Sequence, residues 1–247
     1  MGSLKPYVVA VIADIHGNAI ALRAVLDALA TDAWDELVVA GDLVYRGPRN
    51  ADCVDLVRGL NATTIAGNAD LYVATSEARW AAEMLAEIGS SRANYLASLP
   101  RSHRVTPPGG CTPDDDLLVV HATPTNPQAA LILEDPIYGH PPTPPAKARA
   151  LIGDARANLI VGAHLHYAQA GKVGTQRFET IAPVSFASDG DPRAGYGLAA
   201  WDGSACQLNN RRVTYDVEAV AVEIERTRGP KADHWAHQLR TAIVDEL

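Results

Sequence analysis

Cysteine, long apolar runs and excess positive charge are all scarce in this sequence. The three cysteines (Cys53, Cys111 and Cys206) are widely spaced and form neither a disulfide framework nor a CxxC zinc site. The longest purely apolar runs, such as residues 7–13, are too short to cross a bilayer. Residues 1–3 lack the charged and apolar segments of a signal peptide. We therefore predict a cytoplasmic protein with no membrane partner.

The charge balance excludes another class of partner. The chain has 21 Lys and Arg against 29 Asp and Glu, which gives a net charge of −8. Such a chain has no bulk affinity for nucleic acid, so any phosphate must be drawn in by a local positive site, such as bound divalent cations. With 247 residues, 47% of them hydrophobic, the chain can build a substantial core. We expect a single domain over residues 1–247 and leave the oligomeric state open.

The first half of the chain alternates between expected strands and expected helices. The strand segments are continuous, β-branched apolar runs of the kind that is buried on both faces of a sheet. This alternation predicts an α/β fold with a central sheet and right-handed crossovers. The expected strands cover residues 7–13, 36–40 and 62–66, and the expected helices cover residues 18–30, 51–60 and 71–98.

The second half of the chain is richer in expected strands. Two further buried strands are followed by four strands that Gly and Asp turns join, which we expect to be antiparallel. Residues 124–145 form a loop with seven prolines, and a loop of that length inside a compact domain is often functional. The strands are expected at 116–120, 158–163, 168–173, 179–187, 196–203 and 207–215, and the terminal region 218–247 is expected to hold helices at 218–228 and 232–244.

Metal-ligating side chains follow five of the expected strands directly. Open α/β sheets gather ligand sites at the carboxyl ends of their strands, so we expect these side chains to meet at one edge. Carboxylate oxygen, amide oxygen and neutral imidazole together suit divalent ions such as Mn²⁺, Fe²⁺ and Zn²⁺. The side chains are Asp14 and His16, then Asp42, Asn68 and His121, and finally His164 and His166.

Each of these motifs has a simpler interpretation when taken alone. Asp42 and Asn68 could be turn residues, and His121 could be a hydrogen-bonded core histidine. The pair His164 and His166 could bind one structural zinc ion. A structural zinc site, however, has four closed ligands, and seven candidates are too many for it. We therefore favour two ions that a carboxylate bridges, with a bridging hydroxide that attacks phosphorus.

Together the motifs resemble those of the calcineurin-like metallophosphoesterase superfamily. The matching segments are Asp14-x-His16, Gly41-Asp42 followed by Arg46-Gly47, Gly67-Asn68-x-Asp70, the strand-end His121, and the segment 162–166. The resemblance implies a four-layer α-β-β-α sandwich, an α/β (α+β) fold. Residues 190–203 and the short chain look most like the small bacterial phosphodiesterase branch.

The resemblance also implies a ligand set for two divalent ions, which could be manganese, iron, zinc or nickel. Asp42 would bridge the two ions. The other ligands would be Asp14, His16 and His166 for the first ion, and Asn68, His121 and His164 for the second.

Two further side chains match positions that are near the substrate in the family. Arg46 matches the arginine that contacts substrate phosphate in the protein phosphatases, where a forked guanidinium suits two phosphoryl oxygens; alternatively, it is an exposed turn residue. Asn18 could contact substrate or could cap the helix that it opens. The loop 124–145 directly follows His121, so it could overhang the ions and set substrate size, or it could simply be solvated.

Two linked departures from the family pattern bear on the substrate. In the protein phosphatases a His, held by an Asp, protonates the leaving group; Ala69 and Tyr45 stand at those positions here. General acid catalysis is worth about 10²–10⁴-fold. We therefore favour a hydrolase for aryl phosphates, phosphodiesters or nucleoside polyphosphates, with phosphoserine a poor substrate. The Tyr45 hydroxyl, or Asp70 acting through water, are alternative acids.

Two other functional classes stay open. One is a phosphomonoesterase or protein phosphatase of the same fold. The other is a non-catalytic binding scaffold like a retromer subunit that has lost key ligands, but every expected ligand is present here.

Several further residues lie outside the main motifs. Relatives often have Asn-Pro-Gly-Ser at the position of residues 183–186, where Val184 disfavours the positive φ that glycine permits, so the backbone there is left open. His140, in the Pro-rich loop, could approach the substrate. His103, His234 and His237 are predicted to have surface or structural roles.

Overall fold

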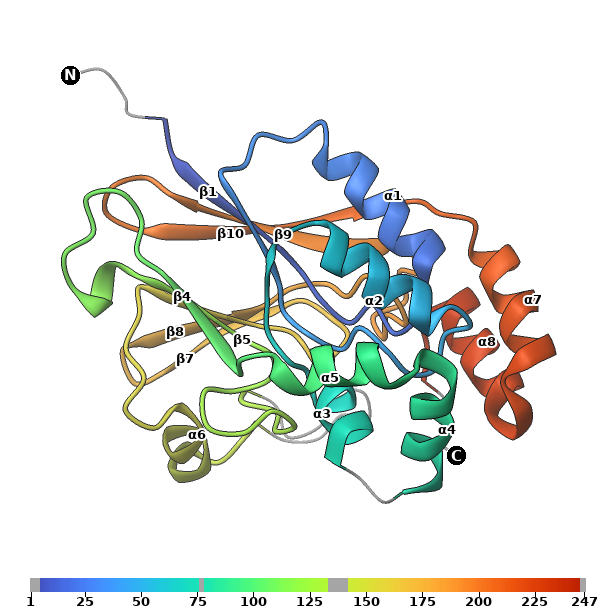
Figure 1. The fold of residues 1–247 in the computed structure, drawn as a ribbon. Coiled ribbons are helices and arrows are strands. Elements are labelled where there is room, and N and C mark those ends of the chain that lie inside the picture. The colour runs from blue at the N-terminus through green and yellow to red at the C-terminus, as the bar shows by residue number, and fades with distance from the viewer. Residues whose placement is uncertain (1–4, 76–77, 133–141, 245–247) are drawn as a thin grey trace.

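Two β-sheets form the centre of the molecule (Figure 1). The computed structural model describes residues 5–75, 78–132 and 142–244, and within them the strands form two five-stranded sheets. The first sheet has the order β10 (Cys206–Val213), β9 (Ala194–Trp201), β1 (Tyr7–Ile12), β2 (Glu36–Val39) and β3 (Thr63–Thr64). The second has the order β4 (Ser102–Val105), β5 (Leu117–Val120), β6 (Leu159–Gly162), β8 (Gln176–Thr180) and β7 (Gln169–Val173).

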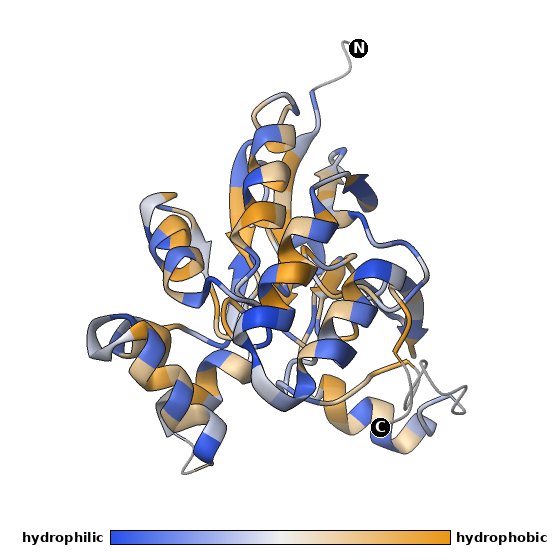
Figure 2. Cartoon of the chain, turned by 90° about the vertical axis from the view of Figure 1, so that its right-hand side faces the viewer, coloured by the Kyte–Doolittle hydropathy of each residue, from blue (hydrophilic) through white to orange (hydrophobic). Residues whose placement is uncertain are grey.

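Helices cover the outer faces of both sheets. The α-helices are α1 (Ala19–Leu29), α2 (Asn50–Gly59), α3 (Asn68–Thr75), α4 (Arg79–Ile88), α5 (Ser90–Ser98), α6 (Pro145–Ile152), α7 (Val217–Thr227) and α8 (Ala232–Thr241). Short 3-10 turns, η1 (Pro113–Asp115) and η2 (Gly229–Lys231), precede β5 and α8. Helices α1 and α2 pack on the first sheet and α6 on the second. The helices carry both hydrophobic and hydrophilic residues, as amphipathic helices do (Figure 2).

The alternation of side chains along β1 explains why the sheets stack. Successive side chains of a strand point to opposite faces. Val9 and Val11 pack between the sheets against residues of β5 and β6, whereas Ala10 and Ile12 pack under the helices with Leu22 of α1. Because both faces of β1 are buried, its sequence shows a continuous apolar run. The layers thus run helix, sheet, sheet, helix, and the predicted four-layer sandwich is confirmed.

The prediction of one central sheet is wrong. Strands β1, β2 and β3 are parallel neighbours in the first sheet, but β5 and β6 are parallel neighbours in the second. The pattern of strands and helices along a chain does not reveal which strands pair. The expected antiparallel arrangement holds for β7 with β8 and for β9 with β10, whereas β8 is parallel to β6.

Several element boundaries also differ from the sequence prediction. The helix expected over residues 71–98 is three helices, and Gly89, at φ 78°, separates α4 from α5. The strand expected at 179–187 ends at Thr180. Beyond it the chain leaves the sheet, and Val184 and Ser185 donate backbone hydrogen bonds to the carbonyls of Ala13 and Asp14. Both residues are buried beside the site.

Two elements were not anticipated from the sequence. Strand β4 is antiparallel to β5 at the edge of the second sheet, and its mostly polar residues gave no apolar signal. Helix α6 begins at Pro145, in a position where proline is well tolerated, although the prolines before it indicate a loop. Among the described residues, no helix is long and apolar enough to span a membrane.

Candidate metal centre

Five loops that follow strands β1, β2, β3, β5 and β6 bring the predicted ligands together at one end of both sheets. The structure forms two groups of side chains whose ligand atoms lie within 4.8 Å of one another. Each group draws on both sheets, so the stacking of the sheets, and not one sheet edge alone, assembles them. The first group is Asp14, His16 and His166, and the second is Asp42, His121 and His164. The seventh predicted ligand, Asn68, has its Oδ1 atom 3.1 Å from His121 Nε2.

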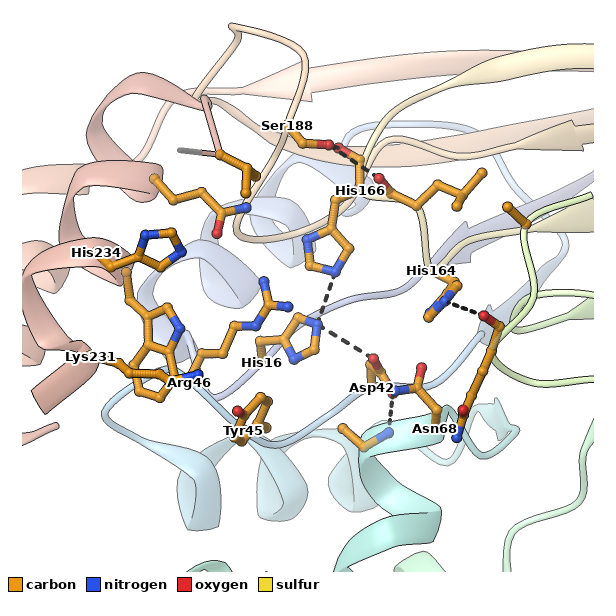
Figure 3. A pocket seen from close by; sticks show the side chains of 17 residues that line it. His16, Asp42, Tyr45, Arg46, Asn68, His164, His166, Ser188, Lys231 and His234 are labelled. Carbon is orange, nitrogen blue, oxygen red and sulfur yellow. Dashed lines mark hydrogen bonds and ion pairs between the residues drawn. The ribbon is translucent and has the colours of Figure 1, made fainter. Parts of the chain in front are cut away.

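Asp42 belongs to the second group but also faces the first (Figure 3). Its Oδ2 atom is 3.5 Å from His16 Nε2 and 3.4 Å from His121 Nε2. Its other oxygen, Oδ1, accepts a hydrogen bond of 2.8 Å from the backbone N–H of Ala69. The carboxylate is therefore fixed on one side by the backbone, while its free side faces both groups.

Backbone carbonyls fix the ring orientation of three of the histidines. Because a carbonyl can only accept, the Nδ1 atom must donate in each case, which leaves Nε2 free to face the site. The pairs are His16 with Val44 O at 3.1 Å, His121 with Ala40 O at 2.8 Å and His166 with Phe186 O at 2.6 Å.

His164 has the opposite ring orientation. Its Nε2 atom donates to the carbonyl of Gln128 at 3.1 Å, so Nδ1 is the atom left free. Gln128 belongs to the Pro-rich segment 124–145, and Ala130 of that segment also lines the cavity described below. The segment thus reaches the site through its first part. His140 and its neighbours at 133–141 lie outside the described residues.

The first group has the chemistry of a cation site. His16 Nε2 and His166 Nε2 are 3.0 Å apart, and both carry lone pairs because their Nδ1 atoms are the donors. Burial lowers the pKa of His16 to about 3 and the pKa of His166 well below its ordinary value. Asp14 Oδ1 is buried without a hydrogen-bond donor among the described residues. Two facing lone pairs and an unpaired carboxylate oxygen fit a divalent cation between them.

In the second group, Asp42 and His121 form an ion pair. Burial alone would lower the pKa of His121, but the adjacent Asp42 carboxylate outweighs it and raises the pKa to about 10. Burial alone would raise the pKa of Asp42, but His121 and the other histidines hold it far below the usual range. Burial, with Asp42 nearby, raises the pKa of Asp14 to about 7. A cation in the second group would replace the His121 proton, as metal binding to histidine generally does.

The ligand loops have an unusual backbone. Five of the ligands have φ between 47° and 69°, a region that non-glycine residues rarely adopt. Backbone hydrogen bonds hold this conformation, for example Asp14 N to Gly41 O at 3.0 Å and His16 N to Asp42 O at 2.9 Å. Such strain is typical of functional sites. The five residues are Asp14, His16, Asp42, His164 and His166.

Asp70 holds two of these loops together and does not reach the cavity. Its fully buried carboxylate accepts hydrogen bonds from the N–H groups of Asp42, Leu43 and Gly67 at 2.8 to 2.9 Å. The sequence offered Asp70 as an alternative acid acting through water, but its carboxylate is fully buried and does not line the cavity. The GNxD motif was the only sequence signal for its supporting role.

Five of the seven predicted ligands, all except Asp14 and His121, line a cavity of about 440 Å³. Arg46 lines it, at φ 67°, with its guanidinium 5.7 Å from the centre of the Phe186 ring. Lys231, His234 and Trp235, from η2 and α8, also line it. Figure 3 shows Lys231 and His234 on the side opposite His164. His234, for which the sequence predicts a surface or structural role, is thus a half-buried residue at the edge of this cavity. Sequence reasoning missed Lys231 and Trp235 because they belong to no motif.

Asn18 is fully buried and does not line the cavity. Its Oδ1 atom accepts from the N–H of Ala21 at 3.0 Å and caps α1, and its Nδ2 atom donates to Ser185 Oγ at 2.9 Å. The structure thus shows the capping alternative and no route to substrate contact. Near Ser185, the positive φ of 55° falls at Phe186, so Val184 needs no strained backbone.

A family model and several known proteins match this chain. The family model described as calcineurin-like phosphoesterase matches residues 7–168. The chain belongs to the calcineurin-like phosphoesterase family. The matched residues include all five ligand loops.

Individual relatives of this phosphoesterase match over shorter segments. An uncharacterized protein of Methanocaldococcus jannaschii is 39% identical over 69 residues, which are 28% of each chain. A protein named bis(5'-nucleosyl)-tetraphosphatase, symmetrical, from Methylococcus capsulatus is 40% identical over 65 residues, or 25% of this chain and 23% of the relative. The matched region thus spans only about a quarter of the length of these curated relatives.

A solved structure is similar over nearly the whole chain. The crystal structure of a metallophosphoesterase from Sphaerobacter thermophilus has a TM-score of 0.72 and covers 96% of this chain and 99% of its own, at 22% identity. At that identity the likeness shows the fold alone.

Proposed function

We propose that this protein is a two-metal phosphoesterase that hydrolyses phosphodiester or nucleotide-type phosphate bonds. The position of Asp42 carries the proposal, because its Oδ2 atom faces His16 of one ligand group and His121 of the other at 3.5 and 3.4 Å. A shared carboxylate is what a dinuclear site requires. Two divalent ions there would supply a water acidic enough to be the nucleophile near neutral pH, and positive charge for the phosphoryl oxygens.

Arg46 is our candidate for orienting the phosphate. It lines the cavity, its guanidinium lies 6.0 and 5.7 Å from the centres of the Tyr45 and Phe186 rings, and it forms no hydrogen bond or ion pair with the described residues. The planar fork can donate two parallel hydrogen bonds to one phosphoryl group. Burial lowers the pKa of Arg46, but an arginine stays charged at neutral pH.

The leaving-group side of the cavity favours diesters and nucleotides. Ala69 and Tyr45 line the cavity where the protein-phosphatase relatives carry the acid dyad. A leaving group that departs as a stable anion needs no such acid. The similarity to a protein named bis(5'-nucleosyl)-tetraphosphatase supports a nucleotide-type substrate.

The exchange Asp42→Asn tests the proposal. The amide keeps the size of the side chain but removes the shared negative charge, so we expect kcat for bis(4-nitrophenyl) phosphate with Mn²⁺ to fall at least about 1000-fold, roughly 4 kcal/mol of barrier. Bound metal, measured by mass spectrometry, should fall from two ions per chain. The control is Asp52→Asn, which changes an exposed carboxylate on α2.

Other outcomes would contradict the proposal. Wild-type protein that holds one tightly bound zinc ion and hydrolyses neither mono-aryl nor bis-aryl phosphate would support a structural site instead. Full activity in a well-folded Asp42→Asn variant would exclude the shared carboxylate.

A further inference from the structure

A second cavity adjoins the metal centre. It has a volume of about 390 Å³, and Tyr45, Arg46 and Trp235 line both cavities. Both volumes lie in the range of small-molecule sites, roughly 300–1,000 Å³. These three shared residues place the second cavity directly beside the cavity at the ligand groups.

Two cationic side chains, Arg46 and Lys231, line the metal-side cavity, and Arg46 also lines the second. Among the described residues neither Arg46 nor Lys231 forms an ion pair, and the metal-side cavity is lined by a single carboxylate, that of Asp42. By contrast, Arg228, which lines the second cavity, forms an ion pair with Glu87 at 2.6 Å. Figure 3 shows Lys231, Arg46 and His234 across the cavity from His164 and Asn68. Unpaired cations on that side suit a second phosphoryl group beyond the scissile one.

The second cavity also has aromatic walls. The Tyr45 ring centre is 4.8 Å from that of Trp80 and 5.6 Å from that of Trp235. All three rings are only half-buried and all three line the cavity. Two of the four tryptophans of a chain with 6% aromatic residues meet here. Exposed aromatic rings beside a positive groove are a common means of stacking nucleobases.

We infer that the two cavities form one groove for a nucleoside polyphosphate. The scissile phosphoryl group lies at the ligand groups, where Arg46 orients it, the next phosphoryl groups contact Lys231, and the base stacks among Trp80, Tyr45 and Trp235. This inference rests on the proposed function and names its substrate class.

The reaction of such a substrate agrees with the missing acid dyad. A water oxygen forms the new bond to phosphorus, the P–O bond to the neighbouring phosphate breaks, and the proton of the water goes to solvent. The leaving phosphate carries the electron pair away as a stable anion, so it needs no proton from position 69 or 45. Ala69 and Tyr45 are thus compatible with this leaving group, and the Tyr45 ring serves the base instead.

Binding and kinetics with two variants test the groove. The first measurement is the Kd of the β,γ-imido analogue of ATP for the Mn²⁺-loaded protein, by calorimetry and by quenching of tryptophan fluorescence. We expect Lys231→Ala and Trp80→Leu each to raise this Kd about tenfold, the usual size for a charge-assisted hydrogen bond or a stacked base. Trp80→Phe, which keeps a ring, should recover most of the loss. Lys172→Ala, an exposed lysine on β7, should change nothing.

The kinetic measurement separates this inference from the proposed function. In Lys231→Ala the preference for ATP or diadenosine tetraphosphate over bis(4-nitrophenyl) phosphate, as a ratio of kcat/KM, should fall about tenfold. An unchanged ratio overturns the groove and leaves the phosphoesterase intact. Analogue binding no tighter than that of inorganic phosphate overturns it as well. If no substrate is hydrolysed but Kd still depends on Lys231 and Trp80, the groove stands and the proposed function fails.

Discussion

The two sides of the cavity are built in different ways. On the ligand side, buried side chains sit on short loops whose backbone is strained and held by hydrogen bonds from neighbouring loops. On the opposite side, Lys231, His234 and Trp235 are exposed or half-buried residues of η2 and α8. The ligand side is therefore fixed by local backbone geometry, whereas the other side depends on how a helical pair docks. The ligand side can therefore stay the same for catalysis, while residues on the opposite side can change and determine which substrate binds.

The docking of that helical pair uses one apolar cluster and several surface ion pairs. Phe186, beside the ligand loops, packs with Ala221 and Ile224 of α7 and Leu239 of α8. Arg49 binds Glu223 at 2.9 Å and Arg228 binds Glu87 at 2.6 Å. Exposed pairs of this kind contribute about 0–1 kcal/mol each, so the apolar cluster dominates the docking.

The largest expected effect concerns protonation of the leaving group. All seven predicted ligands are present, but Ala69 and Tyr45, on two of the ligand loops, replace the acid dyad, so turnover should depend steeply on leaving-group acidity. With Mn²⁺ we expect kcat/KM for 4-nitrophenyl phosphate to exceed that for a phosphoserine peptide by at least about 100-fold. Phenyl phosphate serves as the size-matched control and should fall between them. Equal rates for all three would mean that an acid is present, and His234→Ala would then show whether it is His234.

An intermediate effect is expected from one glycine of the ligand side. A Cβ at Gly67 would lie 2.1 Å from Asp42 Oδ1, so Gly67→Ala must displace the shared carboxylate. We expect the affinity for Mn²⁺, measured by calorimetry, to fall roughly 10–100-fold, as for other changes that misorient ligands. Gly59→Ala is the matched control, because a Cβ there meets nothing within 4 Å at the end of α2. It should raise stability by up to about 1 kcal/mol. Unaltered metal binding in Gly67→Ala would show that the loop relaxes freely.

The smallest expected effect links the two sides. Gln238 of α8 donates a hydrogen bond of 2.8 Å to the Phe186 carbonyl, which also accepts from His166. Gln238→Leu removes this donor, so we expect a loss of about 1 kcal/mol in urea unfolding and a fall in Mn²⁺ affinity of about threefold. Gln207→Leu, on the exposed face of β10, is the control. A metal affinity identical to wild type would mean that the two sides are independent.

The ligand side could be predicted from the sequence because each of its residues directly follows a strand. Asp14, Asp42 and His121 stand immediately beyond apolar runs, so their common location follows from local patterns. The sequence did not reveal that two sheets, instead of one, supply them, since strand pairing is a long-range property. The resemblance to a family provided the four-layer fold.

The opposite side could not be predicted in the same way. Lys231 ends η2 and His234 lies on α8, whose position against the cavity depends on the packing of Phe186 and Leu239. Asp70 was misjudged because a carboxylate that holds backbone amides has the same sequence signature as one that meets solvent. The break at Gly89 was missed because the apolar spacing continues through it.

The Phe186 carbonyl has a thermodynamic consequence. It accepts hydrogen bonds from both His166 and Gln238. By the factor by which the Gln238 contact strengthens cation binding at His166, cation binding must in turn strengthen the docking of α8. Occupancy of the first ion site and hydrogen-exchange protection of the C-terminal helix are thus two readings of one linked equilibrium.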